Sequence, residues 1–309
     1  MRADRRFAKA RMKFRRVVSP DGLRILRQAW RDGAWAELAE PLCPFETQWQ
    51  LSYAAPHARP GAPLLPVQPL SFRDFMLFER HAVDAARGFA RRFMPAAFRV
   101  AQAYERVSRK TFPAFRPGAL WRRQPIYYMG NHLAFVPSGA EVRAPAYTKA
   151  LDYELELGFV LGAPLFDATP QEAERAIAAF VVLNDFTARD VQLAEMRSGF
   201  GPQKSKHFLN SMSQTAVTAD AILPRLDSLS AFVRINGETV ARTDLRGMRH
   251  GLGEALAHVS KDERLFPGEL FGTGTLPGGS GVETGRWLKA GDRIELAIDG
   301  VGAIEHRIL

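Results

Sequence analysis

Hydrophobic and polar positions alternate most clearly in the run LDYELELGFVL, residues 151–161. Side chains in a strand alternate between two faces, so Asp152, Glu154 and Glu156 share one face and the leucines share the other. A solvated acidic face is the simplest interpretation of such a strand. Because the apolar run GFVLG follows directly, the pattern instead favours a buried strand. Aligned carboxylates on such a strand repel one another unless a cation lies between them.

Other segments of the chain show different periods. Residues from Ser71 to about Lys110 have few breakers and are typical of helix. A second helix is predicted over TPQEAERAIAAFVV, residues 169–182, with Thr169 as N-cap and Pro170 at the first helical position. From Ala231 onward the pattern predicts short strands separated by NGE, GTG, PGG, KAGD and DG turns. Without a repeat or a βαβ alternation, we expect an α+β fold with a mostly antiparallel or mixed sheet.

The N-terminal part differs from the rest of the chain in composition and in its predicted elements. Residues 1–11 predict a basic disordered tail, and a strand is expected to begin at Met12. The stretch 54–69 carries five prolines and is typical of a linker. We therefore predict a small β-rich N-terminal domain with its Pro-rich linker over 12–69 and a catalytic domain over 70–309.

Composition excludes several classes of protein. Hydrophobic residues make up 46% of the 309 positions, which is enough for a sizeable core. The one cysteine, Cys43, excludes an intramolecular disulfide and a Cys-rich zinc site. No run approaches the roughly 18 apolar residues of a membrane helix, and no apolar run follows the charged N-terminus as in a secretory signal. We expect a cytoplasmic protein without a membrane partner.

Positive charge is concentrated in two segments. Residues 1–31 hold eleven Lys or Arg and two acids, and residues 87–123 hold ten and one. Each segment therefore carries the +9 that is also the net charge of the whole chain. Two interpretations remain open: an anion-binding surface, or a solvated tail and a solvated helix face. No basic pattern interleaved with aromatics is present, so nucleic acid is not an expected partner.

Further polar residues follow apolar runs in the middle of the chain. Asp185 closes the run VVLN, and Arg189, with its planar fork of donors, lies four residues later. Lys204 and Lys206 lie in the Gly/Pro-bounded segment GPQKSKHF. Carboxylates such as those of the acidic strand and Asp185 offer only oxygen ligands, which suit Mg²⁺ or Ca²⁺. A lysine beside such an ion would stabilise the negative charge that develops on a carbonyl substrate.

Five motifs in order resemble one known family. DYELELGFVLG, LNDFTARD, GPxKxKxF, GTGT and the C-terminal AGDRIEL with DGVGAIEHRI are similar to segments of the fumarylacetoacetate hydrolase superfamily, from about Leu70 to the C-terminus. The resemblance implies a mixed β-roll or β-sandwich catalytic domain, a divalent cation (Mg²⁺, or Ca²⁺ or Mn²⁺) and a homodimer. It also implies a small dicarbonyl or 2-oxo acid substrate.

Two further segments resemble the C–C hydrolase branch, in which Asp-Phe-Tyr-x4-His supplies a metal ligand and the histidine of a His–Glu pair. Here DFMLFERH has that spacing, and Glu283 follows the GTGT motif. The resemblance thus assigns as metal ligands Asp74, Glu154, Glu156 and Asp185. It assigns as catalytic residues His81, Glu283, Lys206 and Arg189, and as substrate contacts Tyr128, Gln192 and Thr275.

The sequence also departs from that branch. Met76 stands where the family has tyrosine, a second tyrosine is missing near Met196, and an arginine is missing near Asn131. The pocket wall is therefore expected to differ while the catalytic residues are retained.

The leading hypothesis is metal-dependent hydrolysis of a C–C bond in a 1,3-dicarbonyl compound, such as an acylpyruvate, with water activated by the His81–Glu283 pair. The alternatives are decarboxylation or tautomerisation of a 2-oxo acid at the same metal, and a non-catalytic or biosynthetic accessory role.

Overall fold

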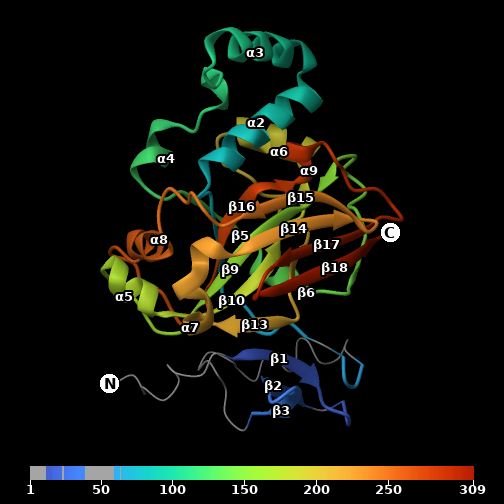
Figure 1. Ribbon diagram of the computed structural model, residues 1–309, viewed down its shortest axis with the longest axis vertical. Coiled ribbons are helices and arrows are strands. Elements are labelled where there is room, and N and C mark those ends of the chain that lie inside the picture. Colours follow the sequence, from blue (N-terminus) through green and yellow to red (C-terminus); the bar gives the residue numbers. More distant parts are fainter. Residues whose placement is uncertain (1–11, 23, 39–58, 63) are drawn as a thin grey trace.

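The computed structural model describes residues 12–22, 24–38, 59–62 and 64–309. The predicted tail 1–11, residues 39–53 of the predicted N-terminal domain and a smaller part of the predicted linker lie outside these residues. Most of the described chain forms two sheets that share one apolar core, with helices at the edges (Figure 1). No sheet in the described part closes into a barrel, and the α+β class with mixed pairing is confirmed.

The larger sheet has the strand order β3-β2-β1-β13-β10-β9-β16-β4-β5, with β12 and β6 attached through β10. Its pairs are antiparallel except β16–β4 and β12–β6. Its strands are β1 Lys13–Val18, β2 Ile25–Arg31, β3 Ala34–Glu37, β4 Phe72–Phe75, β5 Tyr127–Gly130, β6 Phe135–Pro137, β9 Glu154–Leu161, β10 Ile177–Asn184, β12 Asn210–Met212, β13 Thr215–Thr218 and β16 Leu270–Ser280.

The smaller sheet, of order β15-β14-β17-β18-β7, packs on one face of the larger one. Leu155, Leu157 and Phe159 of β9 share a core with Val233 and Leu296 of the smaller sheet. Since side chains alternate, Glu154 and Glu156 point to the other face of β9, as predicted. The strands are β7 Glu141–Val142, β14 Ser230–Ile235, β15 Glu238–Asp244, β17 Arg293–Ile298 and β18 Gly302–Ile308, while β8 Leu151–Asp152 and β11 Thr187–Ala188 pair with each other.

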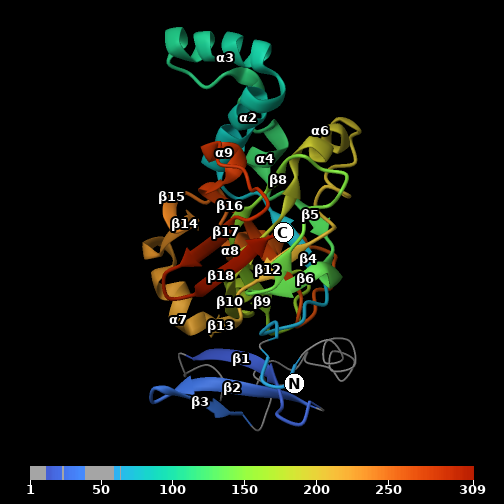
Figure 2. The ribbon, with the colours of Figure 1, turned by 90° about the vertical axis from the view of Figure 1, so that its right-hand side faces the viewer.

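Two helices, α2 and α3, project from the body of the molecule (Figures 1 and 2). They have a small core of their own around Val83, Ala90, Ala101 and Phe115. The α-helices are α2 Glu79–Phe93, α3 Pro95–Ser108, α4 Ala119–Arg123, α5 Pro170–Arg175, α6 Arg189–Arg197, α7 Ala219–Ile222, α8 Leu252–Val259 and α9 Gly281–Thr284, and 3₁₀ turns cover Pro113–Phe115, His132–Ala134 and Leu223–Ser228.

The N-terminal strands β1–β3 form an antiparallel meander that joins the larger sheet. Phe14 of β1 lies opposite Ala216 of β13, so the first strand pairs with a strand some 200 residues later. The predicted domain boundary near residue 69 stays a proposal.

Three element predictions were wrong in extent. The helix predicted over 169–182 ends at Arg175, and Ile177–Asn184 is strand β10, buried on both faces. Residues 72–75, expected to be helical, form β4, and the helix begins only at Glu79. The GTG and PGG segments, expected as turns, lie inside β16 and coincide with its register shifts, since glycines within a strand often accompany bulges.

Candidate metal and catalytic site

Three strands of the larger sheet position the acidic residues of the site. β9 supplies Glu154 and Glu156, β4 supplies Asp74 two strands away, and Asp185 directly follows β10. One carboxylate oxygen each from Asp74, Glu156 and Asp185 lies within 4.8 Å of the other two, and all three side chains are buried. The fold therefore brings together three of the four ligands suggested by sequence.

These three carboxylates fit a hard divalent cation. Burial raises the pKa of Asp74 and of Glu156 well above the usual values, and the neighbouring carboxylates raise them further. Oε2 of Glu156 has no hydrogen-bond partner among the described residues, although it is buried. A cation between the three groups would relieve this repulsion, and Mg²⁺, Ca²⁺ and Mn²⁺ prefer such an oxygen set.

Glycine at position 272 keeps the space beside these carboxylates open. A Cβ built on Gly272 would lie 2.3 Å from Oδ1 of Asp74 and 2.7 Å from Oε2 of Glu156. Such contacts are too short for any side chain, so this position must be glycine for the carboxylates to stay where they are. The sequence analysis noted the GTGT motif but missed this reason for its first glycine.

Glu154, the fourth suggested ligand, is engaged by two cations. Arg189 donates to its Oε1 at 2.6 Å, and the Lys206 ammonium contacts its Oε2. Burial acts to raise the pKa of Glu154, but these two positive charges outweigh it and hold the pKa below its usual value. Glu154 is therefore an ionised carboxylate that joins two cations at the side of the cluster.

Asp185 is the most heavily bonded carboxylate of the cluster. Oδ2 of Asp185 accepts a hydrogen bond from the Tyr128 hydroxyl at 2.6 Å and contacts the Lys206 ammonium. With its amide nitrogen turned toward the carboxylate, Asn210 donates to Oδ1 of Asp185 at 2.7 Å. Sequence reasoning missed Asn210, because a lone asparagine after an apolar run carries no distinctive pattern.

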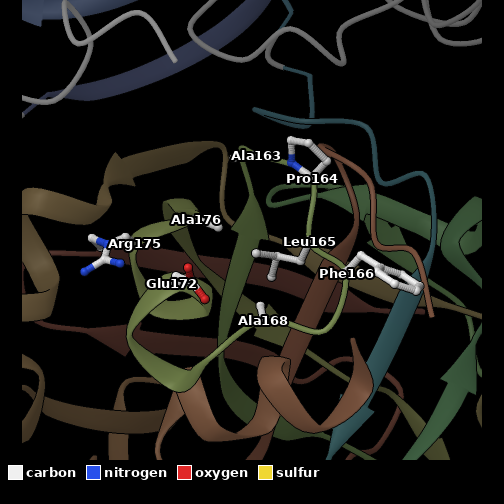
Figure 3. Close-up of a pocket in the computed structure, with 8 residues that line it drawn as sticks. All are labelled: Ala163, Pro164, Leu165, Phe166, Ala168, Glu172, Arg175 and Ala176. Atoms are coloured by element: carbon white, nitrogen blue, oxygen red, sulfur yellow. The ribbon is translucent and has the colours of Figure 1, made fainter. Parts of the chain in front are cut away.

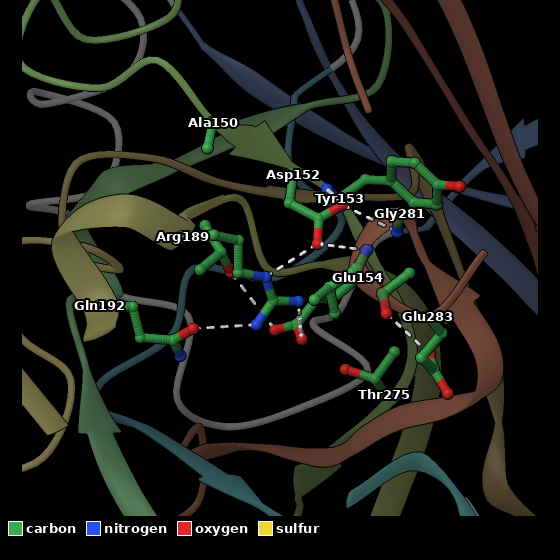
Figure 4. A network of polar contacts seen from close by, with 12 residues as sticks. Ala150, Asp152, Tyr153, Glu154, Arg189, Gln192, Thr275, Gly281 and Glu283 are labelled. Atoms are coloured by element: carbon green, nitrogen blue, oxygen red, sulfur yellow. Dashed lines mark hydrogen bonds and ion pairs between the residues drawn. The ribbon is translucent and has the colours of Figure 1, made fainter. Parts of the chain in front are cut away.

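Arg189, at the first position of α6, is held by three acceptors (Figure 4). Its Nε donates to Asp152, one terminal nitrogen to Glu154, and the other to Oε1 of Gln192 at 3.0 Å. The guanidinium is buried, and its carbon lies 5.7 Å from the centre of the Phe89 ring. Each of its three nitrogens thus donates to an acceptor of the protein, which makes Arg189 a group that positions Glu154 and Gln192.

His81, in the first turn of α2, lies between Glu283 and the acidic cluster. Its Nδ1 is 3.0 Å from Oε2 of Glu283, and its Nε2 is 3.8 Å from Oε1 of Glu154. The first separation is of hydrogen-bond length, and a rotation of the ring would align the bond, since Nδ1 lacks a well-directed partner among the described residues. Nε2 therefore faces the cluster.

The Glu283 side chain is held by the last residues of strand β16, which directly precedes its short helix. Oε1 of Glu283 accepts from the Gly278 amide at 2.9 Å, and Oε2 accepts from the Ser280 hydroxyl at 2.7 Å. Thr275, on the same strand β16, lies 3.4 Å from Oε1 of Glu156 through its hydroxyl. Glu283 and Thr275 thus reach the site from one strand and the turn that follows it, while Ser280 is a further residue that the sequence analysis missed.

One surface cavity lies away from these residues. It has a volume of about 360 Å³ and is lined mostly by the loop 163–168 and by Glu172 and Arg175 of α5 (Figure 3). Glu172 already accepts from Thr169 in the capping box that begins α5, so the cavity offers little chemistry. A second cavity, of about 240 Å³, lies beside α2 and reaches Glu283.

None of the helices in the described ranges is long and apolar enough to cross a membrane.

Known proteins share this sequence pattern and this fold. Residues 97–309 match the family model described as "Fumarylacetoacetate (FAA) hydrolase C-terminal". Mitochondrial oxaloacetate tautomerase FAHD1 of Rattus norvegicus is 31% identical over 186 residues, which are 60% of this chain and 81% of that protein. An uncharacterized protein of Methanocaldococcus jannaschii is 28% identical over 188 residues, 60% of this chain and 73% of that one.

Two solved structures share the fold over nearly the whole chain. A 2-hydroxyhepta-2,4-diene-1,7-dioate isomerase from Mycobacterium marinum has a TM-score of 0.67 at 20% identity and covers 96% of this chain and 98% of its own. A fumarylacetoacetate hydrolase from Exiguobacterium antarcticum has a TM-score of 0.66 at 20% identity and covers 96% and 99%. At this level of identity the likeness concerns the fold alone.

Proposed function

Because the chain belongs to the fumarylacetoacetate hydrolase family, we propose that it is a metal-dependent hydrolase that cleaves a C–C bond of an acylpyruvate or a similar 1,3-dicarbonyl acid. The observation that carries this proposal is the position of His81, between Glu283 and Glu154, the carboxylate beside the cluster of Asp74, Glu156 and Asp185. Location in the cytoplasm and assembly as a homodimer remain proposals that rest on the sequence.

Asp74, Glu156 and Asp185 would hold the cation, with Glu154 beside them. When bound, a divalent cation supplies a Lewis acid that polarises the two carbonyl oxygens of a chelating dicarbonyl. Mg²⁺ is our first choice, because carboxylate-only sites suit hard ions.

His81 would serve as the general base. Its Nε2 faces the cluster, where it would take a proton from water while the hydroxide attacks the carbonyl carbon of the acyl group. Glu283 would orient the ring through Nδ1 and stabilise the positive charge that the imidazole acquires. This role is supported by the hydrogen bonds from Gly278 and Ser280, which hold the Glu283 carboxylate in place.

Breaking the C–C bond of the adduct leaves a carboxylic acid and the enolate of pyruvate. The pair of electrons from the broken bond goes to the enolate, which then takes a proton at carbon to give pyruvate. Lys206, whose ammonium already lies against Glu154 and Asp185, is the protein cation placed to stabilise this charge. Arg189 would contribute through Glu154, because each of its three nitrogens already donates to an acceptor of the protein.

A second candidate is tautomerisation or decarboxylation of a 2-oxo acid such as oxaloacetate. The tautomerase similarity favours it, and proton transfer at carbon needs no attacking water. Lys206 and Tyr128 would be the acid–base groups next to the substrate, and Tyr128 donates to Asp185 in the structure.

Assays on one purified protein separate the two candidates. With Mg²⁺, acetylpyruvate should lose its enol absorbance and yield equal amounts of acetate and pyruvate, and a chelator should stop the reaction. The His81→Ala variant should lose this activity. Keto–enol conversion of oxaloacetate that is faster than acetylpyruvate hydrolysis, and unaffected in His81→Ala, would replace the first candidate by the second.

A further inference from the structure

We propose that the contact between helices α2 and α9 sets the geometry of the His81–Glu283 pair, and that Gly88 and Arg91 of α2 are positioning residues for that pair. The inference rests on the proposed function and adds to it the device that holds the general base against its partner. Neither Gly88 nor Arg91 belongs to the carboxylate site itself.

The two members of the pair come from separate helices. His81 lies in the first turn of α2, and Glu283 lies in the four-residue helix α9. The distance of 3.0 Å between Nδ1 of His81 and Oε2 of Glu283 therefore depends on how the two helices lie against each other. Hydrogen bonds of this kind span only about 2.7–3.2 Å. A relative shift of about 1 Å is enough to separate the two side chains.

Gly88 allows α2 and α9 to meet without a side chain between them (Figure 2). It follows His81 by seven residues, which is about two helical turns, so both lie on one face of α2. A Cβ built on Gly88 would lie 1.8 Å from the carbonyl oxygen of Val282 and 2.7 Å from its carbonyl carbon. These are backbone atoms directly before Glu283. Any side chain at position 88 would push α2 and α9 apart by more than about 1 Å to reach an ordinary contact distance.

Arg91 holds the same junction one turn further along α2. One of its terminal nitrogens lies 3.2 Å from the carbonyl oxygen of Glu283 and 3.4 Å from that of Val282. The last carbonyls of a helix lack partners within the helix, and a positive charge is favourable beside them. Arg91 therefore ties α2 to the backbone of the residue that orients His81.

Both helices are also held on the side of the sheets. The amides of Gly281 and Val282 donate to the Asp152 carboxylate. Directly before α2, the Leu77 amide donates to the Thr273 carbonyl at 3.1 Å. A wedge at position 88 must therefore tilt α2 about its anchored start or pull α9 away from Asp152. Either movement displaces Glu283 relative to His81.

A second glycine separates this role from ordinary helix packing. Gly253 of α8 makes the same kind of contact with α5, since a Cβ built there would lie 2.3 Å from the carbonyl oxygen of Pro170. That junction holds none of the proposed catalytic residues. Gly253→Ala is therefore the matched control for Gly88→Ala, because both place a methyl group against a carbonyl of a neighbouring helix.

The first test compares kcat with KM. With Mg²⁺, Gly88→Ala should lower kcat for acetylpyruvate about tenfold or more and change KM less than about threefold, because a misplacement of about 1 Å can cost up to about 100-fold in rate. Gly253→Ala should keep the wild-type kcat even if urea denaturation shows a similar loss of stability. Unchanged kcat in Gly88→Ala, or an equal loss in Gly253→Ala, would overturn the inference.

Arg91→Ala is a second variant that removes an exposed side chain and leaves the helix contact in place. It should lower kcat at least threefold with little effect on stability. Arg99→Ala, at an exposed arginine of α3, is its control and should keep full activity. If Gly88→Ala does not fold, Arg91→Ala decides, and a kcat equal to that of Arg99→Ala would contradict the proposal.

A double variant shows whether the effect passes through the pair. In the Glu283→Ala background, Gly88→Ala should lower kcat by less than about twofold, because no glutamate remains to be positioned. The same fold-loss in both backgrounds would mean that Gly88 acts on something other than the pair, and would refute the inference.

A structural measurement does not depend on turnover. The crystal structure of Gly88→Ala, or of Arg91→Ala if the former does not fold, should place Nδ1 of His81 beyond about 3.5 Å from Oε2 of Glu283. Mg²⁺ affinity measured by calorimetry should stay unchanged. A pair that remains at its wild-type distance would overturn the inference, whatever reaction the protein catalyses. If the wild-type protein does not hydrolyse acylpyruvates, the proposed function fails and this distance still decides the inference.

Discussion

Arg189 and Asp152 form a buried ion pair in which Nε lies 2.8 Å from Oδ2. The same Asp152 carboxylate accepts hydrogen bonds from the amides of Gly281 and Val282, at 2.7 and 3.0 Å. One aspartate therefore connects the start of α6 with the start of α9, which carries Glu283. The position of the proposed orienting glutamate is linked in this way to the helix that supplies Arg189 and Gln192 (Figure 4).

Removing this aspartate should be costly. Asp152→Ala leaves the Arg189 guanidinium buried with one acceptor missing, and we expect the free energy of unfolding to fall by about 3–5 kcal/mol. Urea denaturation measures this. The control is Glu295→Ala, which breaks a partly exposed pair with Arg234 and should cost about 1 kcal/mol. Similar losses in both variants would show that the buried pair has no special role in stability.

The proposed dyad makes a prediction about additivity. His81→Ala and Glu283→Ala should each lower hydrolysis about 100-fold or more, the range for loss of a positioned general base. The double variant should be no slower than His81→Ala, because an orienting glutamate has no function without its histidine. If the activity losses of the two single variants multiplied in the double variant, His81 and Glu283 would be acting independently. His258→Ala, in α8, is the control and should keep full activity.

The close contact at Gly272 predicts a loss of metal binding. Gly272→Ala would push a methyl group against Asp74 and Glu156, so Mg²⁺ affinity measured by calorimetry should fall at least tenfold. Gly118→Ala is the control, because a Cβ there meets nothing within 4 Å. Unchanged affinity in Gly272→Ala would remove these carboxylates from the metal site.

Chelation should separate activity from folding. Treatment with a chelator should abolish turnover and leave the circular dichroism spectrum nearly unchanged, since the core is apolar and not built on the ion. Unfolding on chelation, as in small zinc modules, would mean that the cation is structural.

His306 predicts how stability depends on pH. Burial lowers its pKa in the folded state, and Nδ1 donates to the Ala140 carbonyl while Nε2 has no partner among the described residues. Below about pH 6.5 the unfolded chain takes up a proton that the folded chain resists. The free energy of unfolding therefore decreases as the pH is lowered. His306→Asn should reduce this fall between pH 7 and pH 5 in urea titrations. An identical pH dependence in both proteins would contradict the assignment.

The sequence predicted the acidic strand well, because a period of two around Glu154 and Glu156 has only one structural meaning. It failed at 176–182, where AIAAFVV is apolar throughout. Such a run fits a buried strand and a buried helix equally, and the predicted Thr169 N-cap, itself confirmed, favoured a longer helix. Pairing with β9 decided the outcome, and pairing is a property of the folded chain.

The sequence was enough to suggest which residues form the site, but not which contacts these residues make with one another. Asp74 and His81 were placed by spacing within one motif, and the fold brings them to the cluster. The engagement of Arg189 by three acceptors could not be foreseen, since Asp152 of β8 and Glu154 of β9 meet Gln192 of α6 only in the folded chain. The contact of Asn210 with Asp185 could not be predicted either, because it also depends on how the strands of the folded chain are arranged.

The pairing of β1 with β13 also bears on self-association. Without the first three strands, β13 would expose a row of unpaired amides and carbonyls, which is a template for strands of other molecules. With them, the edge of the sheet on this side is, among the described residues, β3, a strand of four residues that ends in Glu37. Short strands with charged ends are poor templates, so the N-terminal meander protects the catalytic sheet against aggregation.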